Sequence, residues 1–188
     1  ARREVVDIAN CDNCHKELSL HGNNRTDEPQ VCVTCHNPNA TDARQRVPVA
    51  EPQDPPVDCV NVLGDDDVSV DMKYMIHAIH AGGATGESYQ VCGYRNSVHE
   101  YDFHYPGRLN NCEGCHNEGT YFPVDASAVL GTTVDTGADI VLPTDDVVVS
   151  PNTSVCSTCH TSDLAKTHMT QNGGDFNATK AADSTLIS

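Results

Sequence analysis

The pentapeptide Cys-x-x-Cys-His occurs four times in this chain and limits its fold more than any other feature. Two thiols at this spacing can bind the two vinyl groups of haem, and the histidine that follows can ligate the iron. A lone Cys-x-x-Cys could instead form a redox dithiol or half of a zinc site. Because a histidine follows all four pairs, we expect four covalently bound c-type haems.

The motifs identify the covalent attachment points and the proximal iron ligands directly. The predicted thioether cysteines are Cys11, Cys14, Cys32, Cys35, Cys112, Cys115, Cys156 and Cys159. The predicted proximal ligands are His15, His36, His116 and His160.

The composition indicates that the protein part of the core is small. The chain has 188 residues, no Trp and only 5% aromatic residues. We therefore expect a haem-cored multihaem cytochrome, mostly irregular coil with short α-helices and at most a small β-hairpin, which does not fold stably without haem. We expect a single tetrahaem domain over residues 1–188, made of a haem pair (4–36), a distal-ligand and disulfide region (37–111) and the last two motifs (112–188).

Two cysteines lie outside the motifs. Haem is attached to thiols in an exported compartment, where spare cysteines also oxidise, so we predict a disulfide between Cys59 and Cys92. It would close a loop of about 34 residues, for which chain entropy gives at most about 4 kcal/mol. The sequence has no transmembrane run and no signal peptide. We therefore expect a mature product, or a piece of a larger exported protein.

The net charge argues against nucleic acid as a partner. It is −16 at pH 7, whereas phosphate binding requires a basic face. Haem propionates would make the protein more acidic still.

The supply of distal ligands favours iron held by histidine on both sides. Four irons need four distal ligands, and six histidines lie outside the motifs: His21, His77, His80, His99, His104 and His168. Methionine is the competing ligand type. Of the three methionines, Met72 and Met75 fit the apolar face of a helix better, and Met169 is a weak candidate.

Residues 71–81 are expected to form a helix that ends at Gly82-Gly83. His77 and His80 would lie on one face of this helix, too close together to hold one iron from opposite sides. They could ligate two different, adjacent haems.

Other segments carry weaker structural signals. The prolines of residues 37–60 argue against a regular helix there. Residues 84–111 read as irregular, with aromatic rings that could cover haem edges. A small hairpin is expected from residues 139–142 and 145–149. Helices are expected from Ser150-Pro151 to the fourth motif, and over 163–171, where the second carries His168.

His21 follows His15 so closely that the chain would have to round the edge of its own porphyrin. It is therefore expected to ligate another haem, either the second one of the same chain or the last one of a neighbouring chain. The second option is a head-to-tail contact that builds a helical filament, and the first leaves a monomer.

A haem with both axial positions filled can only gain and lose electrons. The sequence therefore favours a low-potential electron carrier without enzymatic activity. The alternative is a multihaem reductase that keeps one haem open to substrate. The sequence shows no acid–base constellation, which supports the first interpretation.

Several stretches beyond the motifs resemble the OmcA/MtrC family of outer-membrane multihaem cytochromes from metal-reducing bacteria. They are residues 2–7, 18–27, 32–38, 71–82, 105–112, 143–160 and 166–169. The resemblance implies an irregular and helical fold with bis-His haems. It also implies extracellular electron transfer to minerals, electrodes or partner cells. It favours His21, His77 and His80 as distal ligands, while His104, His99 and His168 compete for the last place.

The chain departs from the family in two respects. It lacks the fifth Cys-x-x-Cys-His of the family's pentahaem domains, and it lacks their β-barrel domains. A tetrahaem chain of this kind is also similar to the filament-forming OmcE-type extracellular cytochromes. The resemblance thus predicts other copies of the chain as partners, head-to-tail and sharing His21, together with other multihaem cytochromes and extracellular electron acceptors.

Overall fold

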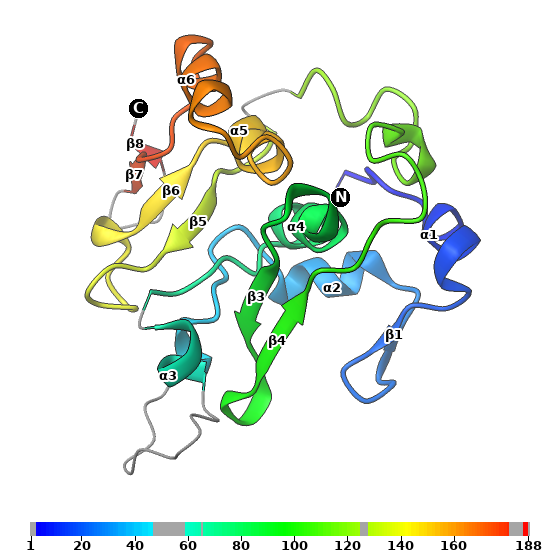
Figure 1. Cartoon of the computed structure of the whole chain (residues 1–188), viewed down its shortest axis with the longest axis horizontal. Helices are drawn as coiled ribbons and strands as arrows, with labels where there is room; N and C mark the ends of the chain where they lie inside the picture. The colour runs from blue at the N-terminus through cyan, green and yellow to red at the C-terminus, as the bar shows by residue number, and fades with distance from the viewer. Residues whose placement is uncertain (1–2, 47–58, 65, 125–127, 181–185, 188) are drawn as a thin grey trace.

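A computed structural model describes residues 3–46, 59–64, 66–124, 128–180 and 186–187. Helix α4 (Met72–Thr85) lies near the middle of the molecule, with shorter helices and small hairpins around it (Figure 1). None of the helices in these ranges is long and apolar enough to cross a membrane.

The other helical elements are short. The α-helices are α1 (Ile8–His15), α2 (Pro29–Cys35), α3 (Cys59–Leu63), α5 (Pro151–Cys156) and α6 (Asp163–Gln171). The 3₁₀ turns are η1 (Ala43–Gln45), η2 (Tyr94–Asn96), η3 (Cys112–Gly114) and η4 (Pro143–Asp145).

The described strands pair into four separate two-stranded antiparallel sheets. The pairs are β1 (Ser19–Leu20) with β2 (Arg25–Thr26), β3 (Tyr89–Cys92) with β4 (Val98–Tyr101), β5 (Thr132–Asp135) with β6 (Val147–Val149), and β7 (Thr179–Lys180) with β8 (Leu186–Ile187). The expectation of short helices in a largely irregular chain is confirmed. The expectation of at most one hairpin is wrong, because short pairs of strands form wherever the chain turns back on itself.

Helix α4 runs further than the sequence predicts. Gly82 and Gly83 lie inside the helix, and a Cβ atom at either position would overlap backbone oxygens of residues 101–103. The helix ends after Thr85, where Gly86 takes a left-handed conformation with φ +74°. The glycine pair therefore allows a close approach of the chain to the helix, and the single glycine behind it ends the helix.

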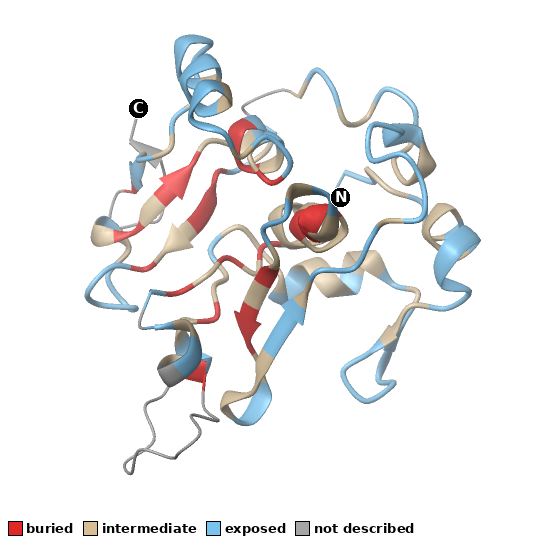
Figure 2. Ribbon diagram, in the orientation of Figure 1, coloured by how far each residue is buried: buried red, intermediate tan, exposed pale blue. Residues whose placement is uncertain are grey.

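The protein core forms where the β3–β4 hairpin packs against α4. Its buried members are Ala78, Tyr89 and Val91, and partly buried Met75 packs against them. The Tyr89 hydroxyl donates a hydrogen bond of 2.8 Å to the Ser69 carbonyl. Figure 2 shows buried residues on α4, β3, β5, β6 and α5 and exposed residues over most other elements. The core is small, as the composition predicts, and Met75 occupies the apolar face as expected.

The β3–β4 hairpin also corrects the expectation that residues 84–111 are irregular. Val91 pairs with His99 and Cys92 with Val98. The sequence does not predict this hairpin well, because β4 is partly exposed and partly polar. Its partner β3 is largely buried.

The predicted disulfide between Cys59 and Cys92 is confirmed, with a Cα–Cα distance of 5.6 Å. It joins the start of α3 to the end of β3. Asp42 accepts a hydrogen bond of 2.7 Å from the Cys92 amide and forms an ion pair of 2.9 Å with Arg46. Of the segment expected to lack a helix, residues 43–45 form η1 and α3 begins at residue 59, while 47–58 lie outside the described residues.

The last third of the chain matches the predicted helices but not the predicted hairpin. Strand β6 pairs with residues 132–135, and residues 139–142 belong to the connection. Behind this sheet, buried Lys180 donates hydrogen bonds to Asp146 and Asn39, each 2.8 Å long. Helices α5 and α6 have the expected positions, and the Ser162 hydroxyl accepts a bond of 3.3 Å from the Ala165 amide at the start of α6.

Candidate haem sites

Local structure presents each motif differently. The first motif lies on α1, whose N-cap Asp7 accepts a bond of 3.0 Å from the Ala9 amide. The second lies on α2, which starts with Pro29, a residue suited to a first helical turn. The third lies on η3 and the fourth at the end of α5. None of the eight motif cysteines is in a disulfide, and all are exposed or half-buried, so haem vinyl groups can reach them.

Three motif histidines each lie opposite a histidine from outside the motifs. The ring centroids are 6.0 Å apart for His15 and His80, 6.0 Å for His21 and His36, and 5.9 Å for His77 and His116. A metal bound about 2 Å from each of two imidazole nitrogens would separate the ring centroids by about 6 Å. The spacing of all three pairs therefore fits one iron between each pair of rings.

Backbone carbonyls fix the orientation of three of these rings. The Nδ1 atom of His36 lies 2.8 Å from the Val70 carbonyl oxygen. On α4, the Nδ1 atoms of His77 and His80 lie 2.6 Å and 2.7 Å from carbonyls one turn earlier. An Nδ1–H that donates to a carbonyl leaves Nε2 free as the ligand atom, which is the usual arrangement of metal-binding histidine.

Electrostatics also favours the neutral form of the imidazoles of His77 and His116, the pair at the third motif. Burial lowers the pKa of His77, and the neighbouring His80 lowers it further. Burial likewise lowers the pKa of His116, and the facing His77 adds to the effect. The Nδ1 atom of His116 is buried and has no hydrogen-bond partner among the described residues. Neutral imidazole is the form that binds a metal.

The first and third motifs lie side by side although they are distant in sequence. Val6 forms a β-bridge with His116, and Asn10 donates a bond of 3.4 Å to the Cys115 carbonyl. Burial raises the pKa of Cys115, and the nearby Cys14 raises it further. The attachment cysteines of the two motifs are therefore close neighbours.

His77 and His80 lie one helical turn apart on α4, as the sequence predicts. They face different motifs, since His77 lies opposite His116 whereas His80 lies opposite His15. Their role as iron ligands remains a prediction. Two ligands of different irons must face two different proximal histidines, and the positions of His77 and His80 on one face of α4 meet this requirement.

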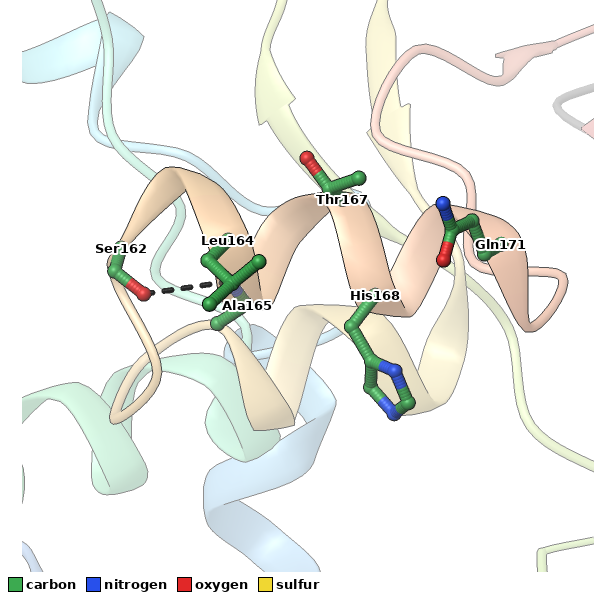
Figure 3. A pocket seen from close by; sticks show the side chains of 6 residues that line it. All are labelled: Ser162, Leu164, Ala165, Thr167, His168 and Gln171. Carbon is green, nitrogen blue, oxygen red and sulfur yellow. Dashed lines mark hydrogen bonds between the residues drawn. The ribbon is translucent and has the colours of Figure 1, made fainter.

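The fourth motif has no such pair. His160 is exposed, and the structure gives its ring no contact with another aromatic ring in the described residues. Among the remaining histidines, His99 is 3.0 Å from the Ser97 hydroxyl and covers Gly93 within its own hairpin. His104 is exposed between two aromatic residues. His168 lines an open pocket of about 500 Å³ on α6 (Figure 3).

Exposed apolar side chains lie next to the motifs. Leu20 is 58% exposed beside His21, and Val31 is 46% exposed beside Cys32. Leu164, on the helix that follows His160, is 81% exposed. A porphyrin bound at each motif could cover such side chains and remove their apolar surface from water.

A protein-only metal centre finds no support. The described residues include every Cys and His of the chain, and they contain no group of three or more Cys, His, Asp or Glu able to hold a metal ion. Pairs of histidines beside thiol pairs are instead the donor set of c-type haem.

Short helices that carry Cys-x-x-Cys-His, with imidazoles facing their histidines, define a c-type cytochrome. The chain belongs to the family of MtrC/MtrF-like outer membrane cytochromes, domains II/IV, whose sequence model matches residues 3–186. No curated protein matches it significantly. The family implies bound haem c, electron transport and export to the outer surface of the cell.

Sequence reasoning missed several residues that shape these sites. Tyr121 packs on His116 with ring centroids 5.3 Å apart. The groups that orient His36, His77 and His80 are backbone carbonyls, which every residue has, so the sequence cannot reveal them. For Tyr121 a signal did exist, because an aromatic residue shortly after a haem motif is a candidate to cover the proximal histidine.

Proposed function

We propose that this protein carries electrons through four c-type haem sites with histidine on both sides of each iron. Bound haem c supplies a one-electron couple and passes electrons to a neighbouring haem. The observation that carries the proposal is the set of three facing histidine pairs at 5.9–6.0 Å. The proposed role is electron transfer without enzymatic activity.

Each pair defines one site in this proposal. Site 1 is His15 with His80, and site 3 is His116 with His77. Site 2 is His36 with His21, whose rings lie 6.0 Å apart in the same chain. With haem bound, His21, His77 and His80 would ligate the iron and so would exclude water and small ligands from it.

Helix α4 contributes residues or hydrogen bonds to the surroundings of all four sites. It carries the distal histidines of sites 1 and 3. At its start, the Met72 amide donates a bond of 3.0 Å to the His36 carbonyl, which links it to site 2. The Thr132 hydroxyl lies 2.7 Å from Asp71 and 3.0 Å from Ser154, which links the same end of α4 to α5 and the fourth motif. A row of close sites is what a conducting chain requires.

For site 4 we propose His160 as the proximal ligand and His168 as the distal one. Helix α6 begins three residues after His160, and its pocket of about 500 Å³ is lined by Leu164, Ala165 and His168. His104 is the competing donor, and His99 is occupied within its hairpin.

Carbon monoxide tests the proposal against the reductase alternative. The reduced protein with all haems attached should not bind the gas, because no sixth position is open. A Soret shift equal to one haem per chain would mean that site 4 is open, and the reductase function would replace the proposed one. The His168→Ala variant should bind one carbon monoxide per chain, and His99→Ala should bind none.

Association into a filament remains a prediction. The pairing of His21 with His36 favours the option in which His21 stays within its own chain, so a ligand shared between copies would have to come from another histidine. Exposed His104 is the remaining candidate. Sedimentation of the native protein over a wide concentration range tests this, and a monomer at high concentration would refute the filament.

A further inference from the structure

The three facing histidine pairs differ in the angle between their rings. The planes are 23° apart for His77 and His116 and 31° apart for His21 and His36, but 84° apart for His15 and His80. The relative orientation of two axial imidazoles sets the energies of the iron d orbitals and hence the low-spin electron paramagnetic resonance signal. Site 1 is thus distinct from sites 2 and 3 in the property that this spectrum reports.

Two aromatic rings hold the His80 side of that perpendicular pair. Phe103 lies edge-on to His80 with centroids 6.0 Å apart at 80°, and Tyr105 does the same at 5.5 Å and 84°. Edge-to-face contacts of this kind favour one ring orientation over others. Together with the 2.7 Å contact of His80 Nδ1 with the Ile76 carbonyl, they leave the ring little freedom to rotate.

The backbone that carries Phe103 and Tyr105 is pressed against α4. A Cβ atom at Gly83 would overlap the carbonyl oxygens of Asp102 and Phe103. On the other side, a Cβ atom at Gly107 would lie 3.1 Å from the Tyr105 ring. Close backbone packing at Gly83, which only glycine allows, therefore sets the position of residues 102–103.

Tyr105 contacts the His80 ring edge-on, so it can act on His80 without being a ligand itself.

We propose that Phe103 and Tyr105 are positioning residues that hold the His80 imidazole perpendicular to that of His15 and so give site 1 an electronic structure different from that of sites 2 and 3. The proposal rests on the assignment of His15 and His80 to one iron. It requires the rings of Phe103 and Tyr105, not the Tyr105 hydroxyl.

The test is the electron paramagnetic resonance spectrum of the oxidised holoprotein. The wild type should show one strongly anisotropic low-spin signal from perpendicular imidazoles, beside rhombic low-spin signals from near-parallel ones. The combined change Phe103→Ala and Tyr105→Ala should convert the anisotropic signal to a rhombic one and leave the others in place. Tyr105→Phe should keep the wild-type spectrum, and so should the control Tyr94→Ala, whose exposed ring lies on the hairpin turn.

A second variant approaches the same contact from the backbone. Gly83→Ala should displace residues 102–103 from α4 and produce the same conversion of one signal. An unchanged anisotropic signal in the double variant, or a Tyr105→Phe spectrum equal to that of the double variant, would overturn the proposal. So would equal disturbance of all four signals. A wild-type spectrum with a high-spin signal in place of the anisotropic one would instead refute the ligand pair of site 1, and with it the proposed function at that site.

Discussion

His77 and His116 lie opposite each other, with their ring centroids 5.9 Å apart and their planes 23° apart, although one lies on α4 and the other follows η3. One helical turn later, His80 meets His15 from α1. A single face of α4 thus joins two segments that are far apart in sequence. The same helix faces the motifs with its histidines and the protein core with Ala78 and Met75.

His77→Ala and His80→Ala should each damage a different haem. The first should convert the haem of the third motif to high spin, and the second that of the first motif, because each variant opens one axial position. Electron paramagnetic resonance of the oxidised variants measures this directly. His99→Ala is the matched control, since His99 bonds to Ser97 within its own hairpin. If both variants changed the same haem, the division of the two histidines between sites would be wrong.

The Cys59–Cys92 disulfide should resist labelling. Cys59 is 0% and Cys92 is 4% exposed, so alkylation of the unreduced protein should modify neither. Replacing both cysteines with alanine should lower the free energy of unfolding by at most about 4 kcal/mol, and the haem content should not change. Denaturant titration of the holoprotein measures the loss, and labelling of both thiols without reductant would contradict the bond.

Asp42→Ala should destabilise the protein strongly. Its carboxylate pairs with Arg46 and accepts bonds from the Val68 and Cys92 amides, all at 2.7–2.9 Å. The change leaves a buried guanidinium without its partner, which costs about 3–5 kcal/mol. Chemical denaturation should show this loss, while the exposed carboxylate variant Asp163→Ala should stay within about 1 kcal/mol of the wild type.

The chain should not fold when haem attachment is prevented. Few large side chains are fully buried, and Val148, at 0% exposure, is one of them. Apolar residues next to the motifs would stay in water. Material made without haem attachment should therefore show rapid proteolysis and no cooperative thermal transition. A cooperative transition near that of the holoprotein would contradict the view that haem forms most of the core.

Sequence reasoning reached the motifs, the disulfide and the two C-terminal helices because these depend on local signals or on a count of residues. A Cys-x-x-Cys-His site and a Ser-Pro helix start are each visible within a few residues, and the disulfide follows from a count of the cysteines outside the motifs. The hairpins were harder to predict, since their strands are short and β4 is largely polar. The length of α4 was also misjudged, because Gly82 and Gly83 serve a close contact with residues 101–103 and not the end of the helix.

The sequence limited the possible pairs of proximal and distal histidines but did not identify them. Helical spacing indicated that His77 and His80 would face different haems, but not which ones. That choice depends on the bridge between Val6 and His116, a contact between segments that no local pattern connects. The aromatic contacts of Tyr105 and Tyr121 depend on the same long-range packing.

The bridge between Val6 and His116 also bears on how the protein is made. The first motif precedes His80 and the third motif along the chain, so in export from the N-terminal side it would emerge before both. Such long-range contacts form slowly, since distant segments must meet first. We therefore expect haem to be attached to the first motif while that segment is still an open chain, and the finished site to assemble around the bound porphyrin.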